Sequence, residues 1–256
     1  MKRLYQSPKT EELVEIAKEA GQRILTIYND NSYQKSIDYK LDNSPLTLAD
    51  KASHAVIVKG LTTKYPEIPI ISEEGDQVDY SIRKNYDLFW LIDPLDGTKE
   101  FINRNGEFTV NIALISDNYP ILGLIYAPVL DVFYIGAKGK AHKIDRGKKT
   151  VLEVTGINNG VAVRSKSHAS SEEEETLNKY NIVDSISVGS SLKFCMVADN
   201  KASLYYRYGP TMEWDTAAGQ AVLEAAGGSV TIETSQNRFT YNKTSLLNTG
   251  FLCKGF

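Results

Sequence analysis

Two carboxylates and a hydroxyl stand close together in the segment Asp93-Pro94-Leu95-Asp96-Gly97-Thr98. The two acids are three residues apart, and the next basic residue is Lys99. Carboxylates this close repel each other unless a cation lies between them, and hard divalent cations such as Mg²⁺ prefer oxygen ligands of this kind. Asp and Gly are also common in turns. The segment alone therefore predicts either a cation site or an acidic surface turn.

Three other segments carry acids near the start or end of an expected helix or strand. Glu73 and Glu74 follow a short apolar stretch, Asp215 lies where an Ala-rich helix begins, and Asp50 lies in an earlier helix. Each acid also has a simpler interpretation, as a solvent-facing turn, a helix cap or a surface residue. If the segments converge, carboxylates could hold two metal ions roughly 3.5–4 Å apart, an arrangement that promotes in-line phosphoryl transfer to water.

Phosphate binding is consistent with the residues that follow these acids. Gly97 allows a tight turn, and the backbone N–H groups of Gly97 and Thr98 could hold an anion. The chain has neither a P-loop motif nor the glycine-rich fingerprint of dinucleotide-binding folds. Its three histidines, His54, His142 and His168, form no zinc-type cluster. These absences disfavour nucleotide-dependent phosphoryl transferases and zinc hydrolases.

Composition limits the class of protein and its partners. The chain has 256 residues, 42% of them hydrophobic, with a formal net charge of −3. The slight acidic excess argues against binding to a nucleic acid polymer. Cys195 and Cys253 are far apart and read as free thiols of a reducing compartment. No secretory signal or membrane-spanning apolar run is evident, so we expect a cytoplasmic protein. Peripheral association with the cytoplasmic face of the inner membrane and the oligomeric state stay open.

The first half of the chain is expected to form an α+β domain, residues 1–155, that carries the acids. An apolar stripe predicts a helix after Ser7-Pro8, and a second helix is expected over residues 47–64. Residues 88–137 are rich in strand-like segments with short turns, which predicts a meandering antiparallel sheet. Pro94 cannot donate to a sheet, so we expect the strand that begins near residue 88 to end there.

The second half, residues 156–256, is expected to form an α/β domain that completes the site. A polar stretch at residues 145–159 without strong periodicity is the best candidate boundary. Beyond it, strand-like segments at 161–165, 185–189 and 203–208 alternate with helical ones at 172–180, 192–198 and 215–226. Such alternation predicts a sheet flanked by helices.

The motifs of the chain resemble those of a known family. Ser72-Glu73-Glu74, the segment 93–98 and Trp214–Gly219 resemble the three signatures of the magnesium-dependent, lithium-sensitive phosphatases of the inositol monophosphatase superfamily. Residues 99–111, 164–168 and 189–194 are similar to the bacterial 3'(2'),5'-bisphosphate nucleotidase branch. The resemblance covers nearly the whole chain. It implies the layered α-β-α-β-α sandwich of the sugar phosphatase fold.

Carried over to matching positions, the resemblance implies a set of metal ligands. Glu73, Asp93 and the main-chain carbonyl of Leu95 would hold one Mg²⁺, and Asp93, Asp96 and Asp215 would hold a second. Lithium would inhibit the enzyme.

The same resemblance implies the catalytic groups. Thr98, with Glu73, would position and activate the attacking water, and the N–H groups of Gly97 and Thr98 would hold the phosphate. Asp50 would support the water network and, where a third ion binds, that ion, so that two or three ions bind per site.

A substrate with a second phosphate also needs cations on the far side of the pocket. Lys193 and Ser190 lie in a loop before a helix, Arg207 ends a strand, and His168 follows another. In the nucleotidase branch, residues at these positions contact the nucleotide; their alternatives are a solvated Lys, a surface Arg and an ordinary loop His. The full expected set of substrate contacts is Glu73, Leu95, Asp96, Gly97, Thr98, His168, Ser190, Lys193, Arg207 and Asp215.

The resemblance implies hydrolysis of the 3'-phosphate of adenosine 3',5'-bisphosphate (PAP) to AMP and phosphate. Its 5'-phosphosulfate analogue (PAPS) would give adenosine 5'-phosphosulfate (APS), and both reactions would support sulfur assimilation. One alternative is an inositol or sugar monophosphate phosphatase with the same machinery. Others are a non-catalytic module that senses nucleotide or metal, and a sulfur-pathway partner protein that acts through contacts.

Overall fold

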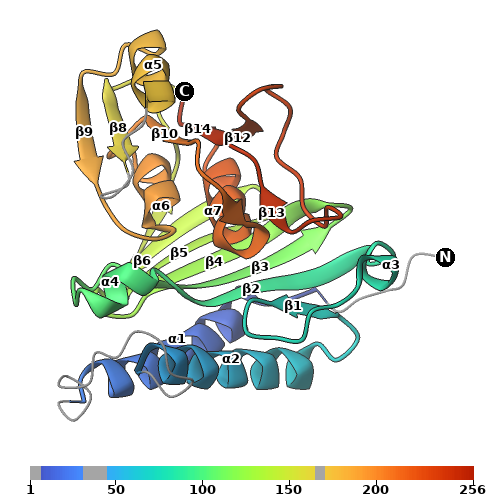
Figure 1. Ribbon diagram of the computed structural model, residues 1–256. Helices are drawn as coiled ribbons and strands as arrows, with labels where there is room; N and C mark the ends of the chain where they lie inside the picture. The colour runs from blue at the N-terminus through green and yellow to red at the C-terminus, as the bar shows by residue number, and fades with distance from the viewer. Residues whose placement is uncertain (1–6, 31–44, 165–170) are drawn as a thin grey trace.

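Helices and sheets alternate through the molecule as α-β-α-β-α layers (Figure 1). The computed structural model describes residues 7–30, 45–164 and 171–256. One apolar cluster fills the space between the first two helices and the larger sheet, a second lies between the two sheets, and a third lies outside the smaller sheet. The predicted layered sandwich is therefore confirmed.

The larger sheet has seven strands in chain order. Its strands are β1 (Ile70–Ser72), β2 (Leu88–Asp96), β3 (Thr109–Ser116), β4 (Tyr119–Ala127), β5 (Val132–Ala137), β6 (Lys140–Asp145) and β7 (Lys148–Leu152). The helices of this part are α1 (Thr10–Tyr28), α2 (Pro45–Lys64), α3 (Tyr80–Arg83) and α4 (Thr98–Ile102). Strands β2 to β5 form the antiparallel meander that the sequence predicted for residues 88–137. Strands β6 and β7 extend it in the same antiparallel way, while β1 runs parallel to β2.

The smaller sheet has the order β12-β14-β10-β8-β9. Its strands are β8 (Val161–Arg164), β9 (Asp184–Ser187), β10 (Leu204–Arg207), β12 (Ser229–Ile232) and β14 (Phe251–Lys254), while β11 (Thr211–Met212) pairs separately with β13 (Leu247–Asn248). The helices are α5 (Ser171–Lys179), α6 (Leu192–Ala198) and α7 (Glu213–Ala225).

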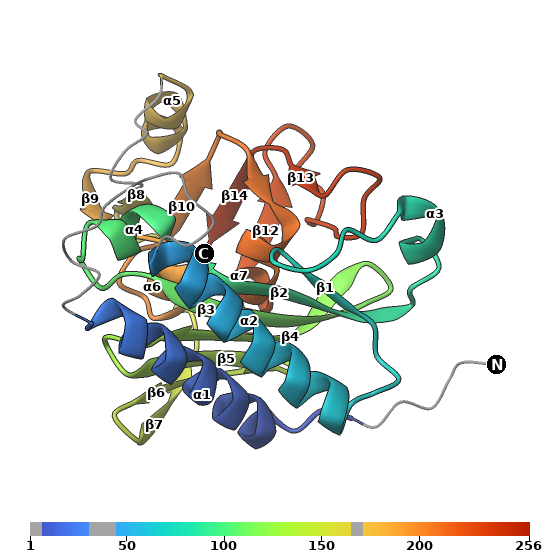
Figure 2. The same cartoon turned by 60° about the horizontal axis from the view of Figure 1, so that its bottom comes forward.

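Helices α1 and α2 lie side by side across one face of the larger sheet (Figure 2). The stripe predicted for α1 is buried there, with Leu13, Ala17 and Ile24 fully covered. None of the helices described here is both long and apolar enough to cross a membrane.

Helix α7 lies between the two sheets and approaches the larger one closely. A side chain at Gly123 of β4 would place its Cβ 2.4 Å from the carbonyl oxygen of Ala218. The absence of a side chain at Gly123, and the small side chains of Ala218 and Ala221 on the helix, therefore allow this contact. Because α7 packs on β3, β4 and β5 as well as on β12, it joins the two halves of the chain. The division at residue 155 stays a prediction.

Strand β2 continues past the point where the sequence predicted its end. Asp93 pairs with Asn111 and Asp96 with Thr109, with a register shift between the two pairs. The prediction that Pro94 ends the strand is wrong, because Pro94 lies in this irregularity, where no N–H is needed for the ladder. Both acids therefore sit at the end of one sheet strand, on either side of the bulge.

Candidate active site

The acidic segments that are distant in sequence meet beside the end of β2. Asp93 is buried, with 1% of its surface exposed. Burial is the main cause that raises the pKa of Asp93 well above its usual range. The negative charges that raise it further come from Asp96, Glu73, Asp215 and Asp50. The convergence predicted from the sequence is thus present in the structure, while the role of each acid as a ligand stays a prediction.

The other acids of this cluster experience the same repulsion. Burial, and then the charges of Glu74 and Glu73, raise the pKa of Asp50 to about 8. Burial, and then Asp96, raise the pKa of Asp215 to about 8. The carboxyl groups of this cluster therefore lose their protons less readily than usual, as expected where carboxylates outnumber nearby cations.

Glu73 lies at the open side of the cluster. Partial burial of its carboxyl group raises the pKa of Glu73, although the residue as a whole is exposed. Its carboxyl group is in hydrogen-bonding contact with that of Asp93, and this contact lowers its pKa in part. Two carboxylates in contact must share a proton or a cation.

The side chains of this acidic cluster fit a hard divalent cation, because every side-chain atom that they could offer as a metal ligand is an oxygen. Within residues 7–30, 45–164 and 171–256, no group of three or more acidic, histidine or cysteine side chains is arranged closely enough to hold a metal ion by itself. Water and substrate oxygens would therefore complete the coordination, as they commonly do for Mg²⁺.

Helix α2 and the bulge of β2 hold this end of the site together. The backbone N–H of Leu95 donates to Asp93 Oδ1 at 3.1 Å, which fixes the carboxylate against its own strand. Ser53 of α2 donates from Oγ to the carbonyl of Pro94 at 2.8 Å. Asp50 lies three residues before Ser53 on the same helix, so this bond also holds Asp50 beside the bulge.

Gly97 connects the bulge to α4, at a position that requires a residue without a side chain. Its φ is +104°, in a region that L side chains rarely adopt. A Cβ there would lie 3.2 Å from Phe108 Cα and 3.2 Å from Ser190 Cβ. The backbone therefore comes close to the loop before α6, and Thr98 begins α4 at this point.

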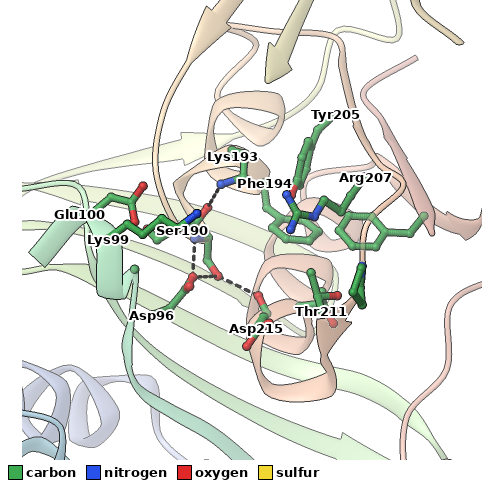
Figure 3. Close-up of a pocket in the computed structure, with 15 residues that line it drawn as sticks. Asp96, Lys99, Glu100, Ser190, Lys193, Phe194, Tyr205, Arg207, Thr211 and Asp215 are labelled. Carbon is green, nitrogen blue, oxygen red and sulfur yellow. Dashed lines mark hydrogen bonds between the residues drawn. The ribbon is translucent and has the colours of Figure 1, made fainter. Parts of the chain in front are cut away.

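A cavity of about 210 Å³ adjoins the acidic cluster (Figure 3). Asp96 and Asp215 lie on one side of it, and Lys193 and Arg207 lie on the other. Lys99 and Glu100, which the sequence did not single out as site residues, also line it. The cavity thus has an acidic end and a cationic end.

The two cationic side chains predicted for the site, Lys193 and Arg207, differ in their hydrogen bonding. Lys193 Nζ donates to the carbonyl of Ser190 at 2.7 Å, and burial lowers the pKa of Lys193. A second acceptor is the carbonyl of Val188, at 3.4 Å. Arg207 Nε, by contrast, is buried and has no hydrogen-bond partner among the described residues. Arg207 therefore has a donor left for a ligand, whereas Lys193 already stabilises its own loop.

Asp215 caps its helix and also belongs to the acidic cluster, while its role as a metal ligand stays a prediction. Its Oδ2 accepts from the backbone N–H of Met212 at 2.8 Å, which caps α7. Its charge also belongs to the acidic cluster, since the charges of Asp96 and Glu73 raise its pKa. A capping contact does not exclude a metal-binding role, because a carboxylate has a second oxygen.

Two polar residues without a predicted role contact Asp96. Ser191 donates from its backbone N–H to Asp96 Oδ2 at 2.6 Å, and its Oγ lies 2.7 Å from the same oxygen. Asn111 donates from Nδ2 to Ser191 Oγ at 2.8 Å, and the same Nδ2 lies 3.4 Å from Asp96 Oδ2. In the sequence, Ser191 and Asn111 stood out only as members of segments that resemble the family. That resemblance gave neither residue a role.

The predicted substrate contacts divide between the cavity and the acidic cluster. Those that line the cavity are Asp96, Gly97, Ser190, Lys193, Arg207 and Asp215. The predicted site residues outside its lining are Asp50, Glu73, Asp93, Leu95 and Thr98. The predicted contact at His168 lies outside the described residues.

Comparison with known proteins agrees with this geometry. The model of the inositol monophosphatase family matches residues 6–252. A 3'(2'),5'-bisphosphate nucleotidase CysQ from Escherichia coli K12 is 46% identical over 241 residues, which cover 94% of this chain and 97% of that protein. The CysQ of Buchnera aphidicola is 42% identical over 245 residues, which cover 94% and 91%.

Solved structures show the same relationship. The crystal structure of CysQ from Bacteroides thetaiotaomicron, described as a bacterial member of the inositol monophosphatase family, is 40% identical, covers 96% of this chain and 97% of that one, and has a TM-score of 0.86. An inositol monophosphatase from Anabaena shares the fold at 24% identity, with 96% and 89% coverage and a TM-score of 0.70. The likeness to the bisphosphate nucleotidase branch is confirmed, and the chain belongs to the inositol monophosphatase family.

Proposed function

We propose that this protein is a phosphoric monoester hydrolase that removes the 3'-phosphate of adenosine 3',5'-bisphosphate, giving AMP and phosphate. The observation that carries the proposal is the cavity in which an acidic end and a cationic end face each other. The bisphosphate nucleotidases at 46% identity over 94% of the chain support the same substrate. Action on the 5'-phosphosulfate analogue, and a role in sulfur assimilation, are further parts of the proposal.

The family is generally metal-dependent, and we infer that the metal is Mg²⁺, with two or three ions per site and inhibition by Li⁺. When bound, the metal supplies activation of water and neutralisation of charge on the leaving oxygen. The protein groups that would hold it are Glu73, Asp93, Asp96, Asp215 and the main-chain carbonyl of Leu95.

The remaining residues would bind and orient the reactants. Thr98 and Glu73 would orient the attacking water, while Asp50 would hold further water next to them. The backbone N–H groups of Gly97 and Thr98 would hold the phosphate that is cleaved. Attack in line by water then releases phosphate without a covalent enzyme intermediate.

The cationic end would bind the phosphate that is not cleaved. Arg207 would donate from its free Nε to that phosphate, since a guanidinium matches phosphate geometry well. Lys193 and Ser190 would hold the loop that faces it, through the bond from Lys193 Nζ to the Ser190 carbonyl. A location in the cytoplasm, with peripheral contact to the inner membrane, stays a prediction.

The test is phosphate release from adenosine 3',5'-bisphosphate, its 5'-phosphosulfate analogue and inositol 1-phosphate, in Mg²⁺ and then with added Li⁺. We expect the bisphosphate to react fastest and Li⁺ to inhibit. Equal rates on the nucleotide and on the inositol ester would contradict the nucleotidase proposal. Tight binding of the nucleotide without phosphate release would instead indicate a non-catalytic sensor.

A further inference from the structure

Ser191 occupies the N-cap position of α6, but its hydroxyl does not cap the helix. A serine at this position usually bonds the backbone N–H two or three residues later. Here the hydroxyl oxygen lies 2.7 Å from Asp96 Oδ2 and 2.8 Å from the carbonyl of Asp215. A residue type that normally stabilises its own helix therefore contacts two acidic residues of the site instead.

A hydrogen-bond series, from Thr109 through Asn111 to Ser191, determines which way the Ser191 hydroxyl donates. Thr109 donates from Oγ1 to Asn111 Oδ1 at 3.0 Å, which leaves the amide Nδ2 to donate to Ser191 Oγ at 2.8 Å. Because Ser191 Oγ already accepts from Asn111, its own hydrogen points toward an acceptor, and the Asp96 carboxylate at 2.7 Å is the stronger one.

The register of the larger sheet places this hydrogen-bond series beside Asp93 and Asp96. Thr109 pairs with Asp96 and Asn111 pairs with Asp93, so alternate residues of β3 stand next to the two ends of the bulge. The three residues of this hydrogen-bond series are all buried, with exposed fractions of 0% for Thr109, 1% for Asn111 and 2% for Ser191. Buried hydroxyl and amide groups are kept only where their hydrogen bonds are satisfied, so this alignment is a fixed feature of the fold.

We propose that Ser191 is a positioning residue that orients the Asp96 carboxylate for metal binding, with Asn111 orienting Ser191 in turn. By holding Oδ2, the Ser191 N–H and hydroxyl leave Asp96 Oδ1 to face a cation. Groups that hydrogen-bond a metal ligand in this way commonly change metal affinity by 10- to 100-fold. The inference rests on the proposed function only in that it takes Asp96 as a metal ligand.

The test measures Mn²⁺ binding by electron paramagnetic resonance without nucleotide, and then kcat and KM for adenosine 3',5'-bisphosphate. We expect Ser191→Ala to bind Mn²⁺ about tenfold more weakly and to lose kcat more than it raises KM. Ser191→Thr, which keeps a hydroxyl, should recover most of the affinity. Ser185→Ala, an exposed serine of β9, is the matched control.

Asn111→Leu is the second variant, chosen because it removes at similar volume the donor to Ser191 and the longer contact, at 3.4 Å, to Asp96 Oδ2. It should lower the Mn²⁺ affinity too, but by less than Ser191→Ala. Mn²⁺ affinity of Ser191→Ala within twofold of the parent, or no Mn²⁺ binding by the parent, would overturn the inference. A parent that binds Mn²⁺ but does not hydrolyse the nucleotide would instead contradict the proposed function, and the ratio of Mn²⁺ affinities would still decide the role of Ser191.

Discussion

The acidic end and the cationic end of the site differ in how the chain builds them. At the acidic end, Asp93 and Asp96 flank one bulge in β2, and burial and mutual repulsion raise the pKa of Asp93. At the cationic end, Lys193 comes from α6 and Arg207 from β10, and only Arg207 keeps a buried donor without a partner among the described residues. The acidic end thus favours a bound cation, while the cationic end keeps the unpaired Nε–H of Arg207 for a ligand.

This difference indicates a division of labour between chemistry and specificity. Acidic groups whose mutual repulsion a bound metal would relieve are expected to take part in the reaction. Cationic groups that can bind a second phosphate are expected to determine which substrate is accepted. Asp96 and Asp215 lie where the two ends meet, since both line the cavity and both interact with the acidic cluster.

Asp96→Asn should have the largest effect, because it removes one charge from the meeting point of the two ends. We expect kcat for phosphate release in Mg²⁺ to fall by at least about a hundredfold, beyond the usual effect of groups that only support a ligand. The melting temperature should be kept or raised, because the change relieves repulsion. Near-normal turnover in Mg²⁺ would contradict the assignment of Asp96 to the metal.

Asp215→Asn and Asp215→Ala separate the capping role from the charge. Asparagine can still accept from the Met212 N–H, so Asp215→Asn should lose activity about as severely as Asp96→Asn while keeping stability. Asp215→Ala should lose activity and, in addition, about 1 kcal/mol of folding free energy as the cap is lost. Activity assays and chemical denaturation measure the two effects. An active Asp215→Asn enzyme would leave Asp215 as a cap alone.

Arg207→Ala should weaken nucleotide binding more than Lys193→Ala. Loss of a charged hydrogen bond to phosphate should raise KM for adenosine 3',5'-bisphosphate about tenfold. Lys193→Ala should raise KM less but lower the melting temperature more, because the Ser190 carbonyl loses its donor at 2.7 Å. Arg23→Ala, an exposed arginine of α1, is the control. The reverse order of KM would contradict the difference between the two cations.

Asp50→Asn should be visible mainly as a change in how stability depends on pH. The pKa of Asp50 rises from 3.8 in the unfolded chain to about 8 in the folded protein. Folding of the metal-free protein therefore takes up a proton between these values, and this group makes it less stable as pH rises through them. Above the folded pKa the penalty is constant.

Chemical denaturation in a chelator from about pH 5 to about pH 9 measures this linkage. The gain in stability of Asp50→Asn over the parent should grow up to about pH 8 and then level off. Added Mg²⁺ should reduce this dependence of the stability gain on pH. A gain that shrinks as pH rises would contradict the buried acidic cluster.

The acidic motif could be predicted from the sequence because its parts are contiguous. Asp93, Asp96 and Gly97 fall within five residues, and their spacing already indicates a strand end with clustered charge. The course of the strand past Pro94 could not be predicted in this way. Proline is compatible with a strand only at an edge or a bulge, and the bulge is visible only once β3 is paired with β2.

The support for Asp96 could not be predicted because its parts are far apart. Ser191 reaches Asp96 across 95 residues of sequence, and a serine before a helix has an ordinary interpretation as a cap. Strand β7 was missed for another reason: its residues Lys148, Lys149 and Thr150 are exposed, so no alternation of apolar residues marks it.

The central claim is that the acidic end carries the reaction and the cationic end selects the substrate. The most direct test is the ratio of kcat/KM for adenosine 3',5'-bisphosphate to that for inositol 1-phosphate, measured in Mg²⁺ for the parent and for Arg207→Ala. We predict a parent ratio well above one that falls about tenfold in the variant. An unchanged ratio would contradict the claim, since the cationic end would then contribute equally to both substrates.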